Sequence, residues 1–243
     1  MYRKLLSFAF SGLVSVSAAC AAQINVDKLA NDVEPDVIKW RHHFHEFPEL
    51  SNREFKTAEY VADYLTSLGL DVQTGVAKTG VVAILDSGNP GPVVALRADM
   101  DGLPVKEQND LAYRSQQMGE YNGKEVPVMH ACGHDTHMAM LMGAAKILTG
   151  IKGELKGKVK FIFQPAEEGA PAGEKGGAEV MVAEGVLKNP DVDAIFGLHI
   201  NANTDVGKVR YNAGGTMAAV DPFKIVIHGK QAHGAYPWKS VDP

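Results

Sequence analysis

Short apolar runs that alternate with helical patterns are the feature that most restricts the fold of this 243-residue chain. The strand-like runs occupy residues 71–74, 80–85, 93–97, 158–164 and 194–198. The helical patterns occupy residues 26–46, 54–68, 138–148 and 178–184. The last three strand-like runs are largely continuous in apolar residues, which is typical of strands buried on both faces of a sheet. The order therefore predicts an α/β fold with a mainly parallel sheet flanked by helices.

Chemically active side chains follow these three buried strands, at the point where each strand ends. They are Asp99 and Asp101 after the first strand, Glu167 and Glu168 after the second, and His199 after the third. The carboxyl ends of parallel strands meet at one edge of an open α/β sheet, where ligands gather. We therefore expect these acidic and imidazole groups to lie close together.

A fourth segment, residues 130–135 with the sequence HACGHD, precedes the helical pattern that begins at Met138. Asp135 and Thr136 are placed to cap that helix, and its positive dipole end is expected to keep Cys132 as a thiolate. Thiolate, imidazole and carboxylate groups are the usual ligands of zinc-type ions, and catalytic ions keep an open position for water. Cys132 could bridge two ions, with His134, Glu168 and His199 as further ligands. The neighbouring glutamate would then stay free as a general base.

Other interpretations of the same residues stay open at this point. A single cysteine is often a buried core residue, and a strand-end histidine is often only hydrogen-bonded. Paired aspartates often form turns, and adjacent glutamates often face solvent. Cys132 with a histidine base would make a cysteine nucleophile, although this leaves the two glutamates without a role. His42 and His45 form another possible ligand pair, but packing roles are more usual for such residues.

The N-terminus has the pattern of a secretory signal peptide. Basic residues precede an apolar stretch over residues 5–16, which is too short for a membrane span, and small residues follow at 17–22. We expect cleavage after Ala21 or Ala22 and export to a periplasm or beyond. Lipid attachment at Cys20 is the less favoured alternative, because Ser17 stands where lipoprotein signals usually have leucine. Removal of this segment leaves Cys132 as the only cysteine, free to bind a metal.

Composition restricts the partners and the number of domains. A net charge of −5 without a basic cluster gives no indication of a nucleic-acid partner. The pattern changes after Gly207: residues 208–211 suggest a short strand, and residues 222–229 alternate like a half-exposed antiparallel strand. We therefore predict a signal peptide at 1–22, a catalytic domain at 23–213 and the beginning of a second domain at 214–243. Since one strand cannot form a domain, we expect the chain to be truncated.

Six motifs cover the chain from about residue 35 to its end. They are RHHFH with PELS at 41–51, LRADMDGLP at 96–104, HACGHD at 130–135, QPAEEG at 164–169, GLH at 197–199 and GKQAHGAYP at 229–237. Together these motifs resemble the metallo-amidohydrolase family of hippurate hydrolase, auxin-amino-acid conjugate hydrolases, aminoacylases and related carboxypeptidases. Single motifs of this set are only suggestive, whereas their combination is specific.

The resemblance implies a site for two divalent ions, Zn or Mn, with Co or Ni as alternatives. The metal ligands that it implies are Cys132, His134, Glu168 and His199. Glu167 would be the general base that activates water, Asp101 an orienting carboxylate, and Asp99 a group near the site. The implied reaction is hydrolysis of the amide bond of N-acyl amino acids or short peptides.

The resemblance also implies a smaller inserted α+β lid domain, which forms homodimers in many members. The histidine that matches His233 reaches the active site and stabilises the developing oxyanion, often across the dimer. The family has a further metal-binding histidine near the C-terminus, on a segment that does not occur in the 243 residues. An alternative is therefore a truncated, non-catalytic remnant that binds metal or dimerises.

Overall fold

The computed structural model describes residues 24–219 and 223–242. Residues up to Ile200 belong to one compact unit, and those from Asn201 onward to a second. The expected signal peptide at 1–22, with Cys20, lies outside the described residues. In the part of the chain that the structure describes, no helix has the length and apolar character needed to cross a membrane.

A five-stranded sheet forms the centre of the first unit. Its strands, in spatial order, are β1 (Asp71–Val76), β2 (Gly80–Asp86), β6 (Lys158–Gln164), β3 (Val93–Asp99) and β7 (Ala194–Gly197). β6, β3 and β7 are parallel, whereas β1 and β2 run antiparallel to their neighbours. The connection between β1 and β2 is too short for a crossover, so these two strands form a hairpin. The predicted α/β class is confirmed, with a mixed sheet whose parallel strands are the three that carry the candidate site residues.

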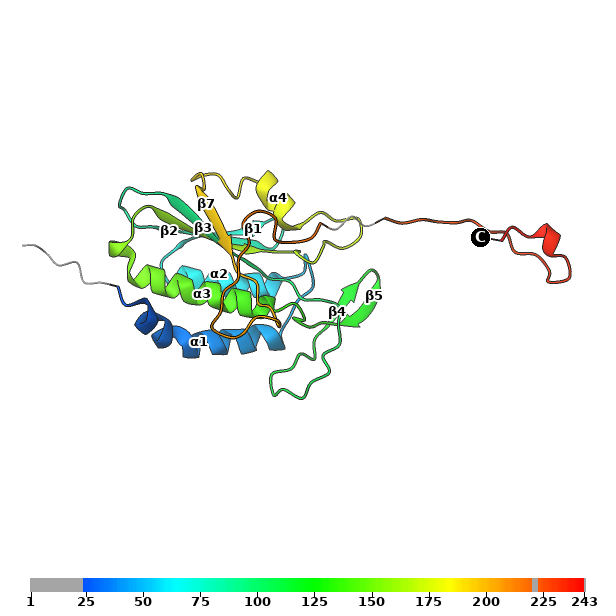
Figure 1. The fold of residues 1–243 in the computed structure, drawn as a ribbon, viewed down its shortest axis with the longest axis horizontal. Coiled ribbons are helices and arrows are strands. Elements are labelled where there is room, and N and C mark those ends of the chain that lie inside the picture. Colours follow the sequence, from blue (N-terminus) through cyan, green and yellow to red (C-terminus); the bar gives the residue numbers. More distant parts are fainter. Residues whose placement is uncertain (1–23, 220–222, 243) are drawn as a thin grey trace, which may run out of the picture. The chain divides into compact units, whose positions relative to one another are not determined.

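Helices cover both faces of this sheet (Figure 1). The helices α1 (Val26–Glu46), α2 (Phe55–Ser67) and α3 (His134–Gly150) lie on one side, and α4 (Gly177–Ala183) lies on the other. A single 3₁₀ turn, η1 (Lys152–Glu154), follows α3. The predicted helices agree with these bounds to within a few residues, except that α3 begins four residues earlier than its apolar pattern.

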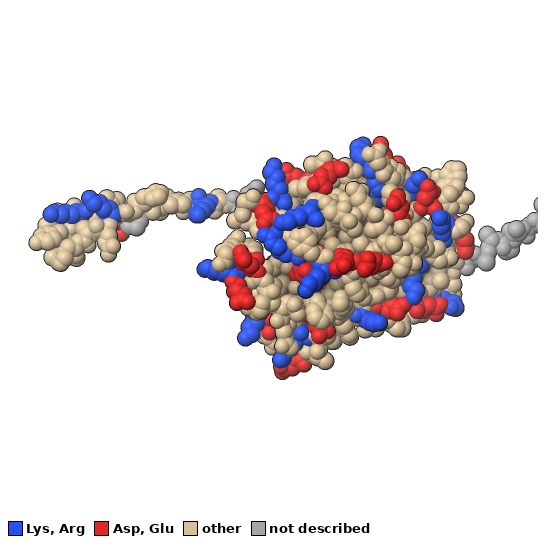
Figure 2. Space-filling model, turned by 180° about the vertical axis from the view of Figure 1, so that it is seen from behind, with Lys and Arg blue, Asp and Glu red and all other residues tan. Residues whose placement is uncertain are grey.

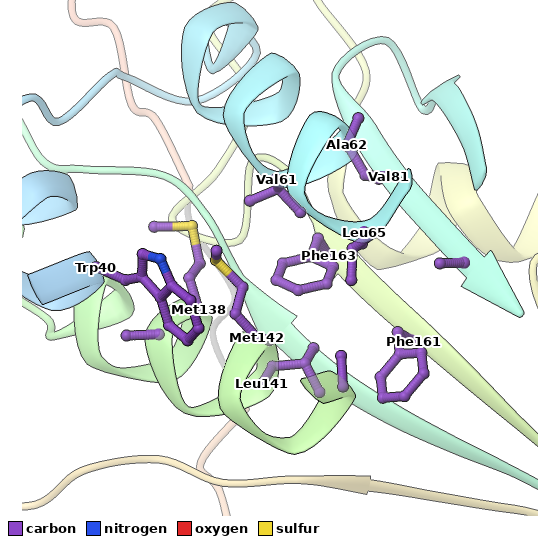
Figure 3. Close-up of a cluster of buried hydrophobic side chains, with 14 of the residues drawn as sticks. Trp40, Val61, Ala62, Leu65, Val81, Met138, Leu141, Met142, Phe161 and Phe163 are labelled. Atoms are coloured by element: carbon purple, nitrogen blue, oxygen red, sulfur yellow. The ribbon is translucent and has the colours of Figure 1, made fainter. Parts of the chain in front are cut away.

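The main core lies between the three helices and one face of the sheet (Figure 3). Leu65 and Val61 of α2 and Met138 and Met142 of α3 pack around Phe163 of β6, and all five are fully buried. The opposite face of the sheet carries a smaller cluster with Val82, Ala95, Ile162 and, from α4, Met181. Side chains alternate between the faces along each strand, so a largely apolar strand such as β6 supplies both clusters.

The connections reverse the strand order at the carboxyl end of β3. The chain passes from β3 through α3 to β6, and from β6 through α4 to β7 on the other side of β3. Ligands in open α/β sheets bind where the strand order reverses in this way. The register sets Asp99 beside Gln164 and Arg97 beside Gly197, so the ends of the three parallel strands share one edge.

Three local predictions are wrong. β7 was expected to be buried, but Ile195 and Phe196 are at least half exposed, because β7 is the edge strand and has a neighbour on one side only. The helix α3 is not capped by Asp135 or Thr136, since Gly133 occupies the N-cap position with φ of +91°. Asp135 lies in the first turn and binds other side chains instead.

The third wrong prediction concerns the strands expected at 208–211 and 222–229. Among residues 201–219 and 223–242 the structure has one isolated bridge, Lys230 with Val241, and a 3₁₀ turn η2 (Pro237–Lys239). Alternating sequence forms a strand only where another backbone pairs with it, and the described residues of the second unit offer no such partner beyond the bridge.

Residues 105–129 form an excursion between β3 and the loop before α3. It contains the hairpin of β4 (Met118–Tyr121) and β5 (Lys124–Pro127), whose turn residues Asn122 and Gly123 both have positive φ. On the face of the molecule shown in Figure 2, basic and acidic side chains are interspersed.

Candidate metal centre

The thiol of Cys132 and the ring of His199 are in direct contact. The Sγ atom of Cys132 is 3.3 Å from Nε2 of His199, and Nδ1 of His199 donates a hydrogen bond to the carbonyl oxygen of Ile200 at 2.6 Å. This bond leaves Nε2 as the nitrogen that faces the thiol. One ligand atom each from Cys132, His134 and His199 lies within 4.8 Å of the other two.

His134 is the buried centre of the site. Its ring is fully buried, and its Nδ1 is 3.4 Å from Oδ1 of Asp101, but neither ring nitrogen makes a hydrogen bond of good geometry. Its Nε2 is 3.7 Å from Oε2 of Glu167, 3.8 Å from Oε1 of Glu168 and 3.7 Å from Oδ2 of Asp99. Burial lowers the pKa of His134, but the surrounding carboxylates outweigh this effect and the pKa is raised.

Asp101 accepts hydrogen bonds from the backbone N–H groups of both glutamates. Its Oδ1 accepts the backbone N–H of Glu167 at 3.1 Å, and its Oδ2 accepts that of Glu168 at 3.0 Å and the hydroxyl of Ser51 at 2.6 Å. Burial opposes ionisation of Asp101, but these bonds and the nearby His134 keep its pKa below the ordinary value. Asp101 therefore fixes the backbone from which both glutamates project.

Glu54 fixes the residue just before the glutamates. Ala166 has φ of +48°, which is unfavourable for a residue with a Cβ atom. Its N–H donates to Oε1 of Glu54 at 2.8 Å, and the hydroxyl of Thr79 donates to Oε2 at 2.7 Å. The Glu54 side chain is fully buried, and burial raises its pKa to about 7. Sequence reasoning missed Glu54, because no nearby residue marks it as part of a site.

The protonation of Cys132 differs from the prediction. Burial and then the neighbouring acids, Glu168 first, raise the pKa of its thiol to about 12. With the pKa raised in this way, the metal-free protein holds a thiol and not a thiolate. Burial also raises the pKa of Glu168 above its ordinary value.

The histidines near residue 45 do not join the cluster. His45 contacts Oδ2 of Asp135 at 2.9 Å through Nδ1 and Oε1 of Glu107 at 2.8 Å through Nε2, whereas His42 stacks on Tyr113. Both ring nitrogens of His45 are therefore used by carboxylates, which the sequence did not indicate. The hypothesis that His42 and His45 bind a metal as a pair has no support in this geometry.

His137 is a second residue that sequence reasoning missed. Its Nδ1 donates to Oδ1 of Asp99 at 2.6 Å, and its Nε2 accepts the backbone N–H of Ile200 at 2.9 Å. The spacing of His134 and His137, three residues apart on one helix, was the available signal. Asp99 thus lies near the site, as expected, but its main partners are Arg97 and His137.

His233 belongs to the second unit. Its Nδ1 accepts the N–H of Ala235 at 3.0 Å, within the turn that precedes η2. Its predicted role in stabilising an oxyanion stays a prediction.

The donor set fits divalent ions of the zinc type. His134, Glu167 and Glu168 form a second group of potential ligands, so sulfur, nitrogen and oxygen donors surround a buried ring whose nitrogens are not bonded. A buried polar atom without a partner is costly, and a bound cation would satisfy it. The structure thus brings Cys132, His134, Glu168 and His199 together with Glu167; their roles as ligands and base stay predictions.

Comparison with known proteins agrees with this chemistry. The chain is 45% identical over 222 residues to thermostable carboxypeptidase 1 of Saccharolobus solfataricus, covering 90% of this chain and 53% of that protein. It is 44% identical over 217 residues to an N-acyl-L-amino acid amidohydrolase of Geobacillus stearothermophilus, covering 89% and 55%. The chain therefore spans about half the length of the curated relatives that it matches.

A solved structure is also similar. The YXEP protein of Bacillus subtilis, described as a dinuclear metal binding peptidase from the M20 family, superposes with a TM-score of 0.62 at 39% identity. The match covers 71% of this chain and 44% of that one. Residues 95–243 also match the model of peptidase family M20/M25/M40. The resemblance predicted from the motifs is thereby confirmed, and the chain belongs to peptidase family M20/M25/M40.

Proposed function

We propose that the protein hydrolyses the amide bond of N-acyl amino acids or short peptides at a centre of two divalent ions, Zn or Mn, with Co or Ni as alternatives. The observation that carries this proposal is the ring of His134, which is fully buried, lacks a hydrogen bond of good geometry at either nitrogen, and is surrounded by the thiol, imidazole and carboxylate groups. The names of the relatives, a carboxypeptidase and an N-acyl-L-amino acid amidohydrolase, support the substrate class.

The two adjacent glutamates have different tasks in this proposal. Bound divalent ions would polarise the substrate carbonyl and lower the pKa of water. The side chain of Glu167 is 37% exposed and that of Glu168 is 22% exposed, which favours Glu167 as the residue that reaches water and substrate. Glu167 takes a proton from water and passes it to the leaving amine, and Glu168 serves as a ligand with Cys132. Asp101 keeps the two glutamates at a fixed spacing through their backbone N–H groups.

Three further points belong to the proposal. His233 stabilises the oxyanion, the protein acts as a homodimer through its second domain, and the N-terminal segment directs export to the periplasm or the medium. The pattern of residues 1–22 supports export. Sequencing of the mature N-terminus tests it, and a mature protein that still begins at Met1 would contradict it.

The main experiment counts metal and measures turnover on the same preparation. The 243-residue chain is purified, its metal per chain is determined, and a panel of N-acyl amino acids and dipeptides is assayed before and after chelation. We expect bound metal, turnover that chelation abolishes, and recovery when Zn²⁺ or Mn²⁺ returns. Full turnover in a metal-free sample contradicts the proposal. Bound metal without any turnover supports the alternative, a metal-binding protein that is not catalytic.

A further inference from the structure

A buried histidine outside the predicted ligand set connects the central strand to the loop that carries His199. His137 lies on α3, one turn after His134, and is almost fully buried. Its Nδ1 is 2.6 Å from Oδ1 of Asp99, at the end of β3, and its Nε2 is 2.9 Å from the backbone nitrogen of Ile200. The residue thus joins a strand, a helix and the loop after β7.

These two contacts define which nitrogen of His137 carries its proton. A backbone N–H can only donate, so Nε2 of His137 accepts and Nδ1 carries the hydrogen that Asp99 receives. Burial raises the pKa of Asp99, but hydrogen bonding from His137 and the charge of Arg97 outweigh this and keep the pKa well below its ordinary value. The guanidinium of Arg97 donates to the other oxygen of Asp99 at 2.6 Å, which fixes the carboxylate.

Close packing alone would place His137 among potential metal ligands, because it lies within 4.8 Å of Asp99 and His134. Its hydrogen bonds argue against that role. Both ring nitrogens are already engaged, one as donor and one as acceptor, so no lone pair is left for an ion. These hydrogen bonds place His137 as a support for a neighbouring metal ligand and not as a ligand itself.

His137 acts on the backbone of Ile200. Its N–H is held by His137, and its carbonyl oxygen accepts the Nδ1–H of His199 at 2.6 Å. The two bonds fix the backbone beside His199 and also the rotation of its ring, with Nε2 toward Cys132. The side chain of Ile200 fills the space where a Cβ atom on Gly133 would lie, so the same residue also packs against the loop before α3 that carries Cys132.

We propose that His137 is a positioning residue: Asp99 orients its ring, and the ring holds the backbone of Ile200 so that Nε2 of His199 faces the Cys132 thiol. The inference rests on the proposed function, because it concerns a ligand of the same centre. Groups that orient metal ligands through hydrogen bonds commonly change metal affinity by about 10–100-fold when removed.

The test measures Co²⁺ binding to the 243-residue chain and to three variants. The near-ultraviolet charge-transfer absorption between Co²⁺ and a thiolate reports ligation by Cys132, and titration gives the affinity. H137L removes both hydrogen bonds and replaces the histidine by a side chain of similar volume. H137Q keeps one donor and one acceptor, and M138L, at the next and equally buried position of α3, is the matched control for changes in the core.

We expect H137L to weaken Co²⁺ binding by about 10–100-fold and to reduce the thiolate absorption. H137Q should recover most of the affinity, and M138L should stay within about twofold of the wild type. A folded H137L that binds Co²⁺ like the wild type overturns the inference. Equal losses in H137L and H137Q overturn it as well, because the two hydrogen bonds would then not matter. If the wild type itself binds no Co²⁺, the proposed function is contradicted first, and the inference with it.

A measurement on the wild type covers the case in which H137L does not fold. Nitrogen-15 NMR of the histidine rings distinguishes the two neutral forms of imidazole. At about pH 8 we expect His137 to carry its hydrogen on Nδ1 alone. A hydrogen on Nε2 would be incompatible with the bond from Ile200 and would overturn the inference without any variant.

Discussion

The Sγ atom of Cys132 lies 3.3 Å from Nε2 of His199, although 67 positions separate the two residues in the chain. The contact joins the loop before α3 to the loop after β7. In the metal-free protein it is a contact between a thiol and an imidazole, because the pKa of Cys132 is raised to about 12. Coordination of a cation requires the thiolate, so binding and deprotonation are coupled.

The first prediction concerns this coupling. Binding of Zn²⁺ to the wild type at about pH 7 should release a proton from Cys132, and the affinity should rise as the pH rises. C132S should bind Zn²⁺ more weakly and release about one proton fewer per chain. Calorimetric titration in buffers with different ionisation enthalpies measures the proton count. Equal proton release by the wild type and C132S would show that Cys132 is not a ligand.

The second prediction separates the two glutamates. E167Q should retain bound metal and lose turnover by about 10²–10⁴-fold, since a general base contributes about that much. E168Q should lose metal affinity, and its turnover should fall with its metal content. Metal analysis and kinetics on both variants provide the comparison, with each serving as the control for the other. The reverse result would exchange the roles proposed for Glu167 and Glu168.

The third prediction concerns the buried bridge of His45 between Asp135 and Glu107. Hydrogen bonding to Asp135 outweighs burial and raises the pKa of His45, so the folded protein binds this proton more tightly than the unfolded chain. The resulting stabilisation is complete below the unfolded value of about 6.5 and is lost as the pH rises through the folded pKa. H45L should lower the free energy of unfolding by about 1–3 kcal/mol, because each of two buried carboxylates loses one hydrogen-bond partner, while Asp135 keeps Arg41 and Glu107 keeps the N–H of Ser115.

Urea denaturation at about pH 6 and about pH 9 tests this prediction, with the larger loss expected at the lower pH. H42L is the matched control, because His42 lies on the same helix but stacks on Tyr113 and contacts neither carboxylate. A loss in H45L that is the same at both pH values would mean that the charge of His45 does not contribute.

The fourth prediction concerns Glu54, whose pKa is raised by burial to about 7 from an ordinary value of 4.5. Between these values the unfolded chain loses the proton and the folded protein keeps it, so stability falls as the pH rises from about 4.5 to about 7. The full effect is about 3 kcal/mol. E54Q keeps an acceptor for Ala166 without a charge, so its stability relative to the wild type should increase across this range.

Denaturation at about pH 5 and about pH 8 measures this change. E59Q, at an exposed position of α2, is the control and should show no such trend. If E54Q is less stable than the wild type at the higher pH, the ionised carboxylate is required to hold Ala166 in its left-handed conformation.

The sequence predicted the strands and the groups at their ends because both follow from local pattern. The strands β3 and β6 are apolar runs. Asp99 is the last residue of β3, and Glu167 and His199 follow the ends of β6 and β7. Parallel strands with helical crossovers bring such ends to one edge, so the convergence of the candidate ligands could be inferred without coordinates.

Only the tertiary structure decided which group each polar side chain meets. His137 with Ile200, His45 with Glu107 and Glu54 with Ala166 are contacts between residues more than 60 positions apart, and neither partner alone indicates the other. The raised pKa of Cys132 has the same origin, because burial and the nearby carboxylates depend on how distant segments pack. Local pattern therefore determined where the site would form, and packing determined the protonation and orientation of the groups within it.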